Sequence, residues 1–224
     1  MSDFRLISER YVLPTPAGAF YAVSGTAQDS ARQFIFSLMA DEQSKYLSAD
    51  DLLELTDAET EQDALEMIYR VQTLGWVQGE DTVREAPSGT LEDELPALLR
   101  ALTGSGKALL ADHQGFYLAT EGFSHETAEE LSALTADLAS LHQRHSGLLA
   151  KNLAIDSSAW ALVDASGNSR LGCWPMNIGG HRFTLVIFGV PQFNQWPFVQ
   201  LAWMLTKRYS VVHKARDVEA GLVL

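Results

Sequence analysis

The stretch that decides the fold is Lys107 to His145, which reads KALLADHQGFYLATEGFSHETAEELSALTADLASLHQRH. Two short apolar runs, 108–110 and 116–118, flank Asp112 to Gly115, whose polar and glycine residues are typical of a turn. The pattern predicts a β-hairpin followed by one long helix. Because this helix has too little polar surface for an ordinary surface helix, the stretch indicates a binding surface rather than a catalytic centre.

The predicted helix begins after Ser124, which can cap its first turn, and its early glutamates suit the positive end of the helix dipole. At about 100° per residue, the side chains fall into three arcs. Large apolar side chains form the first arc: Leu131, Leu134, Leu138 and Leu141. Small side chains form the second arc: Ala128, Ser132, Ala133, Ala136, Ala139 and Ser140. A narrow strip is charged: Glu130, Asp137, Arg144 and His145.

A helix that lies on one sheet needs a single apolar stripe. The arc of small residues therefore predicts a second packing partner, whose backbone can approach the helix closely. Two partners fit this pattern: another subunit, or a neighbouring domain of the same chain.

The composition is that of a folded globular protein, with 224 residues and 46% hydrophobic side chains. No run approaches the roughly 18 apolar residues of a membrane helix, and the first residues lack a secretory pattern, so we expect a cytoplasmic protein. With 29 acidic and 16 basic residues, the net charge is −13. This excess disfavours nucleic acid and anionic membranes as partners and favours proteins with basic surfaces.

Two segments resemble chemical sites only in part. Gly104 to Lys107 has the look of a phosphate loop, but Ala101 and Ala108 stand where a Walker A motif has Gly and Ser or Thr. The single cysteine, Cys173, lies in an apolar run, which favours burial over reactivity.

Two histidines are spaced as metal ligands could be, but this spacing also has a non-functional explanation. His142 and His145 lie one helical turn apart and would bind a metal only with His125 or Asp137, and such spacing arises by chance at any polar helix end. The sequence therefore predicts no catalytic residue, no metal site and no cofactor.

A linker near residues 85–90, which contains Pro87, Ser88 and Gly89, divides the chain. We expect a first domain at 1–86, a second at 91–208 and a tail at 209–224. The first domain is predicted to be winged-helix-like, with an N-terminal hairpin. Its expected elements are a hairpin joining 11–13 to 19–23, helices over 30–40, 48–55 and 56–75, and a two-stranded wing over 76–84.

The charge of this domain argues against DNA binding. Residues 30–85 hold four basic and 13 acidic side chains, a net of −9. In a DNA-binding winged helix, the third helix would enter a groove of the duplex. Here its several acidic side chains would meet the DNA phosphates, and Arg70 alone offsets them. We therefore expect the domain to bind protein.

Besides the long helix and the hairpin before it, the second domain is expected to contain five further elements. They are a helix over 91–102, a strand pair over 158–163 and 170–174, a central strand over 183–188 and a last helix over 194–208. The resulting order is helix, two strands, helix, three strands, helix.

This order of elements and some local sequence segments resemble the Roadblock family of dynein light chain-like domains over about residues 91–208. The most telling segments are GFYLATEG at 115–122 and EELSAL at 129–134. The resemblance implies an α+β fold, in which a five-stranded antiparallel sheet lies between one long helix and two terminal helices. It supplies no catalytic signature.

The resemblance also implies partners. Family members, which occur in bacteria too, typically pair through the long helix and an adjacent sheet edge, and many bind or regulate small Ras-like GTPases. On this chain the edge strand lies near 160–163. The implied dimer interface comprises Ala128, Ser132, Ala133, Ala136, Ala139, Ser140, Trp160 and Leu162.

Two loop aromatics, Phe193 and Trp196, are further candidates for contact with a partner. We therefore expect a non-enzymatic, homodimeric regulatory or scaffold protein that binds a partner protein, by resemblance a small GTPase whose activity it regulates. The alternative is a DNA-binding transcription regulator that dimerises through its Roadblock-like domain.

Overall fold

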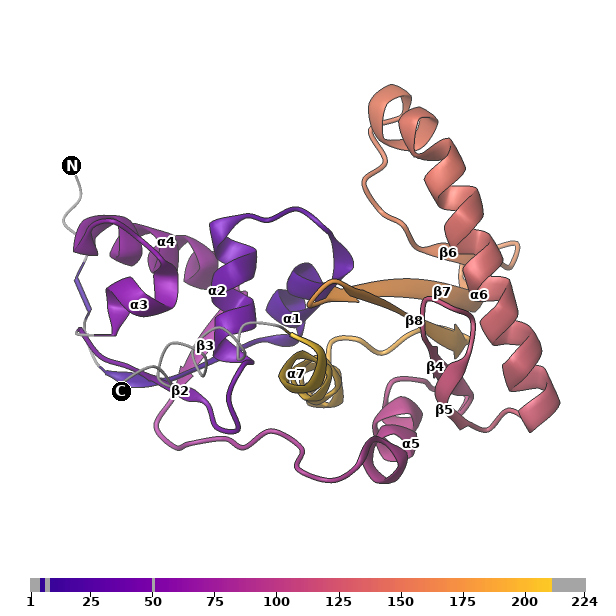
Figure 1. The fold of residues 1–224 in the computed structure, drawn as a ribbon, viewed down its shortest axis with the longest axis horizontal. Coiled ribbons are helices and arrows are strands. Elements are labelled where there is room, and N and C mark those ends of the chain that lie inside the picture. Colours follow the sequence, from indigo (N-terminus) through magenta and orange to yellow (C-terminus); the bar gives the residue numbers. More distant parts are fainter. Residues whose placement is uncertain (1–4, 7–8, 50, 211–224) are drawn as a thin grey trace, which may run out of the picture. The chain divides into compact units, whose positions relative to one another are not determined.

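The structure is a computed structural model that describes residues 5–6, 9–49 and 51–210 (Figure 1). The chain divides by its contacts into two compact units. The first draws its described residues from Met1–Ala22, Thr26–Ser88 and Phe198–Leu224, and the second from Val23–Gly25 and Gly89–Pro197. From residue 211 onward, the expected tail lies outside the described residues.

The first unit is built on a three-stranded antiparallel sheet in the order β2-β1-β3. β1 (Arg10–Pro14) is central, and β2 (Lys45–Leu47) and β3 (Val77–Glu80) pair with its two sides. The helices that lie wholly or mostly in this unit are α1 (Pro16–Ser24), α2 (Ser30–Leu38), α3 (Leu52–Thr56), α4 (Glu61–Thr73) and α7 (Trp196–Tyr209).

The expected N-terminal hairpin is wrong, because residues 19–23 belong to helix α1 and not to a strand. Pro16 occupies the first turn of α1, where a missing N–H costs no helical hydrogen bond. Thr15 caps that turn: its Oγ1 accepts from the Gly18 N–H at 3.2 Å, and its carbonyl accepts from the Ala19 N–H at 2.9 Å. These start signals outweigh the β-prone composition of the run that follows.

The expected two-stranded wing does not form in the part of the chain that the structure describes. β3 pairs with β1, with Val77 opposite Pro14, and not with residues 82–84. The segment after β3 instead bonds to the segment before β2: Ser44 N–H donates to the Arg84 carbonyl at 2.8 Å. The three predicted helices are present as α2, α3 and α4, but a winged helix is not confirmed, since β1 takes the place of the second wing strand.

Helix α7 packs within the first unit. The ring of Phe198 lies 6.0 Å from that of Phe20, and the indole N–H of Trp203 donates to the Asp41 carbonyl at 2.8 Å. Trp203 is fully buried. The resemblance places this helix in the domain at 91–208, whereas its residues from Phe198 onward have their contacts with the N-terminal unit.

The second unit contains the predicted five-stranded antiparallel sheet, in the order β5-β4-β8-β7-β6. Its strands are β4 (Ala108–Ala111), β5 (Tyr117–Glu121), β6 (Trp160–Val163), β7 (Ser169–Ile178) and β8 (His181–Phe188). Its helices are α5 (Leu91–Ala101) and α6 (His125–Ser146), and α6 continues into the π-helical turn η1 (Gly147–Asn152). The predicted order of elements from α5 to α7 is confirmed.

Helices α5 and α6 cover opposite faces of this sheet. Leu109 of β4 points toward α6 and packs with Ala128 in one buried cluster. Ala108, the residue before Leu109, points to the opposite face of the sheet. Glu121 of β5 pairs with Ala108 and points to that same face. Arg100 of α5 forms an ion pair with Glu121, which places α5 on that second face.

Gly122 lets the chain turn from β5 into α6. Its φ is +72°, and a Cβ there would lie 2.2 Å from the Gly106 carbonyl oxygen. We expect Gly122→Ala to lower the free energy of unfolding by about 2–4 kcal/mol, because a backbone clash adds to the cost of a left-handed conformation.

Gly167→Ala is the matched control, since Gly167 has a φ of +83° but open space around it. Its expected loss is only about 1 kcal/mol. Urea unfolding of the two variants gives the comparison. Equal losses would contradict this account of how the chain enters α6.

Candidate interaction surface

Helix α6 rests on the sheet through its smallest side chains. Ala128 and Ser132 are fully buried, and Thr135 is almost so. Both buried hydroxyls bond within the helix: Ser132 Oγ donates to the Ala128 carbonyl and Thr135 Oγ1 to the Ser132 carbonyl, each at 2.7 Å. Because these residues are small and need no bonding partner on the sheet, the helix can lie close to it.

The cluster beneath α6 is apolar. Ala128 packs over Leu109, Val186 and Cys173, which come from β4, β8 and β7. Burial raises the pKa of the Cys173 thiol to about 11, so the uncharged thiol is the form in the folded protein at neutral pH. The predicted burial of this cysteine is confirmed.

This contact corrects the predicted dimer interface. Ala128 and Ser132 face the sheet of their own chain, so neither side chain is available to a second subunit. The reason is the phase of the helix: at about 100° per residue, the sheet-facing side lies between the two predicted arcs. Leu131 and Leu138 pack only partly against the core, and Leu134 is 41% exposed.

A backbone does approach the small residues of α6, and it is that of the chain's own hairpin. A Cβ on Gly115, whose φ is +88°, would lie 3.3 Å from the Ser132 carbonyl oxygen and 3.4 Å from Ala136 Cβ. Asp112 holds this turn, since its Oδ1 accepts from the Phe116 N–H at 3.0 Å. For this part of the small arc, the close partner lies within the subunit.

Other residues of the predicted interface stay at least partly accessible. On the helix these are Ala133, Ala136, Ala139 and Ser140. On β6, Trp160 is half-buried against α6, with its indole N–H 3.4 Å from His142 Nδ1, and Leu162 is 68% exposed. The role of these residues between subunits stays a prediction.

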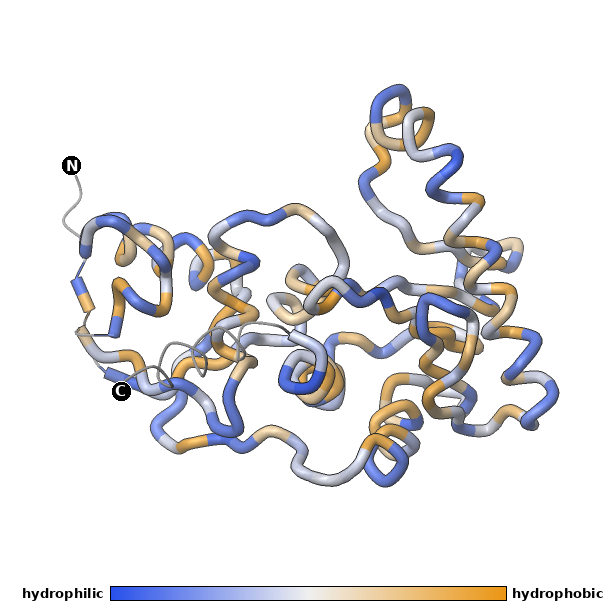
Figure 2. The backbone as a smooth tube through the Cα atoms, in the orientation of Figure 1, coloured by the Kyte–Doolittle hydropathy of each residue, from blue (hydrophilic) through white to orange (hydrophobic). Residues whose placement is uncertain are grey.

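Beyond the sheet, α6 continues into an arm with little cover. Figure 1 shows the C-terminal end of α6 and η1 extending past β6, before the chain returns to that strand. This arm, residues 143–159, exposes Leu148, Leu153 and Ile155, each by 45–56%. Figure 2 shows hydrophobic positions continuing to its tip. Exposed apolar side chains gathered on a protrusion are typical of an interaction site.

The arm lies next to an open sheet edge. β6 pairs with β7 on one side, and among the described residues no strand pairs with its other side. Leu162 and Val163 are 68% and 59% exposed, so the strand offers apolar side chains on both faces. An edge of this kind can accept a strand or helix of another chain. We call β6 and the arm together the edge surface.

Sequence reasoning found Leu162 but missed the arm. The segment after His145 mixes small, polar and apolar residues without a clear helical period, so the exposure of Leu148, Leu153 and Ile155 had no sequence signal. Phe116, which is 69% exposed at the tip of the β4–β5 hairpin, was also missed because it was assigned to a strand.

The two candidate aromatics have contacts within the chain. Phe193 packs edge-on against Trp174, with ring centroids 5.3 Å apart, and is half-buried. Trp196 is the first residue of α7 and is also half-buried. Their role in partner binding stays a prediction.

His125 lies at the opposite end of α6 from His142 and His145. Tyr117 Oη lies 2.6 Å from His125 Nδ1 at the N-terminal end, while His142 contacts Trp160 near the other end. Across residues 5–6, 9–49 and 51–210, no group of three side chains is arranged to hold a metal ion. Within the same residues, no helix has both the length and the apolarity that crossing a membrane requires.

The fold and this surface define a mixed α/β protein with a five-stranded antiparallel sheet and an open apolar edge. No family model and no curated protein matches the chain. Among solved structures, it is similar to one described as MglB with tetrameric arrangement, at 21% identity and a TM-score of 0.37, over 56% of this chain and 93% of that one.

Two further solved structures are similar to the chain. One is Myxococcus xanthus MglB, at 17% identity and a TM-score of 0.31, over 54% of this chain and 95% of that one. The other is the gliding protein MglB from Thermus thermophilus, at 21% identity and a TM-score of 0.33, over 56% and 94% of the two chains.

Proposed function

We propose that the protein is a homodimeric regulatory scaffold, without catalytic activity of its own, that binds a small Ras-like GTPase. The observation that supports this best is the edge surface, where an apolar arm lies beside an unpaired strand. A surface of this kind serves binding.

Self-association through the edge surface has a simple energetic basis. Full burial of one leucine or valine side chain contributes about 1.5–3 kcal/mol. In a two-fold dimer each residue contributes twice, so Leu162, Val163 and the apolar residues of the arm would together offset much of the entropy lost on association. Pairing of β6 with its own copy would also satisfy the free backbone groups at that edge.

The proposed partner class comes from the sequence. The segments at 115–122 and 129–134 resemble Roadblock domains, a family in which many members bind or regulate small Ras-like GTPases. The net charge of −13 suits a partner with a basic surface. In this proposal the N-terminal unit also binds protein rather than DNA, since the exposed Glu61, Asp63 and Glu66 of α4 outnumber Arg70.

The oligomeric state tests the pairing step. Light scattering of the purified chain at micromolar concentration should give twice the 24.6 kDa of one chain. Leu162→Asp should give a monomer, because it would bury a charge at the centre of the new interface. The matched control, Ala165→Asp, adds the same charge in the exposed turn after β6 and should stay dimeric. A monomeric wild-type chain would show that the proposed homodimer is wrong.

The partner class needs a separate test. The immobilised protein should retain a small GTP-binding protein from native lysate, and retention should differ between a GTP analogue and GDP because regulators distinguish the two states. Mass spectrometry identifies the retained proteins. If dimerisation holds but the retained proteins include no GTP-binding protein, the scaffold role stands and the GTPase assignment is wrong.

A further inference from the structure

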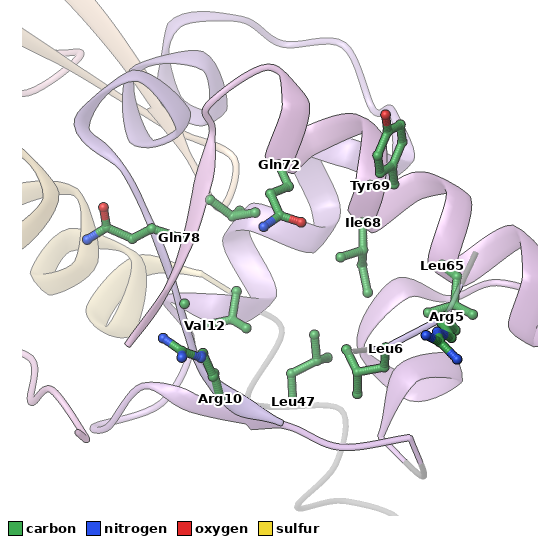
Figure 3. A pocket seen from close by; sticks show the side chains of 12 residues that line it. Arg5, Leu6, Arg10, Val12, Leu47, Leu65, Ile68, Tyr69, Gln72 and Gln78 are labelled. Carbon is green, nitrogen blue, oxygen red and sulfur yellow. The ribbon is translucent and has the colours of Figure 1, made fainter. Parts of the chain in front are cut away.

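A cavity of about 500 Å³ lies between α4 and one face of the β2-β1-β3 sheet (Figure 3). Its volume falls within the range of small-molecule sites. All of its lining residues belong to the first unit, so the cavity is complete without the edge surface.

Apolar side chains from both the sheet and the helix form the floor. Strand alternation turns Val12 of β1 toward α4, and the pairing of β1 with β2 and β3 brings Leu47 and Val77 to the same face. From α4 come Leu65 and Ile68, which lie about one turn apart. None of the five is more than 9% exposed, so the floor belongs to the packed core of the unit.

Positive charge lies at the ends of this apolar floor. Figure 3 shows Arg5 and Arg10 at opposite ends of the cavity. Among the described residues that line it, none is acidic. This contrasts with the 13 acidic and four basic side chains of residues 30–85, which make up about half of the same unit. The cavity therefore selects for an anionic group in an otherwise acidic part of the chain.

Arg10 is the better placed of the two arginines, since it extends from a paired strand. A Cβ on the neighbouring Gly79 would lie 3.1 Å from Arg10 Cδ. The Arg10 side chain therefore passes over Gly79, where a larger residue would crowd it. Arg10 Nη1 lies 3.3 Å from Asp81 Oδ1, but the Asp81 side chain is 81% exposed. An ion pair this open is weak, and a bound carboxylate can displace it by pairing with both guanidinium nitrogens.

We propose that this cavity binds a small apolar acid, in which an aromatic or aliphatic body lies on the floor and one carboxylate or sulfonate pairs with Arg10. Gln72 extends from α4 toward the sheet and offers its amide to the same ligand (Figure 3). Such a ligand would join α4 to the sheet and so give the first unit a binding function that is separate from the edge surface.

A pair of fluorescent probes tests both parts of the proposal on the full chain. 1-Anilinonaphthalene-8-sulfonate has an aromatic body and one sulfonate, and N-phenyl-1-naphthylamine has the same body without the charge. The sulfonate probe should bind one site per chain, and sodium decanoate should displace it. Its affinity should fall as sodium chloride is added, whereas that of the neutral probe should not.

Two arginine variants locate the anionic group. Arg10→Gln should weaken the sulfonate probe about tenfold and leave the neutral probe unchanged, because a charge-assisted contact is lost. Arg70→Gln is the matched control. Arg70 is exposed on α4 but does not line the cavity, so the affinity of neither probe should change. Gln72→Trp should weaken both probes, because the larger side chain would occupy part of the cavity.

Three results would overturn the proposal: no saturable binding of the sulfonate probe, equal affinity for the two probes, or equal effects of Arg10→Gln and Arg70→Gln. Near-ultraviolet circular dichroism shows whether each variant keeps its tertiary structure, since a loosened core would take up both probes. The salt dependence of the wild-type chain needs no variant and decides the charge selectivity by itself.

Discussion

The close seating of α6 on its sheet is the contact on which the second unit depends. Because the small residues Ala128 and Ser132 lie against the sheet, the helix axis can approach the sheet closely. The leucines of α6 then lie on the side of the helix, and Leu134 is exposed. The helix has 22 residues, about 33 Å at 1.5 Å per residue. Five strands spaced about 4.8 Å apart span only about 19 Å. Because α6 contacts β5 through His125 and β6 through His142, its last residues and η1 extend past the sheet as the arm.

Among the described residues, this geometry leaves apolar surface uncovered at one edge of the sheet. The arm carries Leu148, Leu153 and Ile155 past β6, and β6 itself ends the sheet with Leu162 exposed. A monomer with such an edge would be prone to uncontrolled association. A defined dimer removes that hazard by covering the same groups. The proposed pairing of two copies thus depends on the length of one helix and the position of one strand.

Local signals in the sequence predicted most elements correctly. The turn at Asp112 and the cap at Ser124, whose Oγ accepts from the Thr127 N–H at 3.3 Å, are both present. These features depend on a few neighbouring residues, and so the sequence alone is enough to identify them. The run 19–23 was misassigned because its composition favours a strand, while the decisive Thr15 and Pro16 precede it.

Features that depend on distant residues were harder to predict. The side of α6 that meets the sheet could not be fixed from its pattern, because alanines and serines are as compatible with a tight internal contact as with a subunit interface. Likewise, β1 lies between β2 and β3, which come from positions about 35 and 65 residues further along the chain. The cavity beside α4 depends on that pairing, and no motif in the sequence pointed to it.

Hydrogen exchange tests the central claim most directly, because the described residues of one chain leave the edge surface uncovered. At micromolar concentration, the account predicts slow exchange for the outward-facing amides of β6 and for the arm, since a second copy would cover them. The exposed loop at 26–28 should exchange fast in the same experiment. Exchange of the edge surface at the rate of that loop would contradict the account.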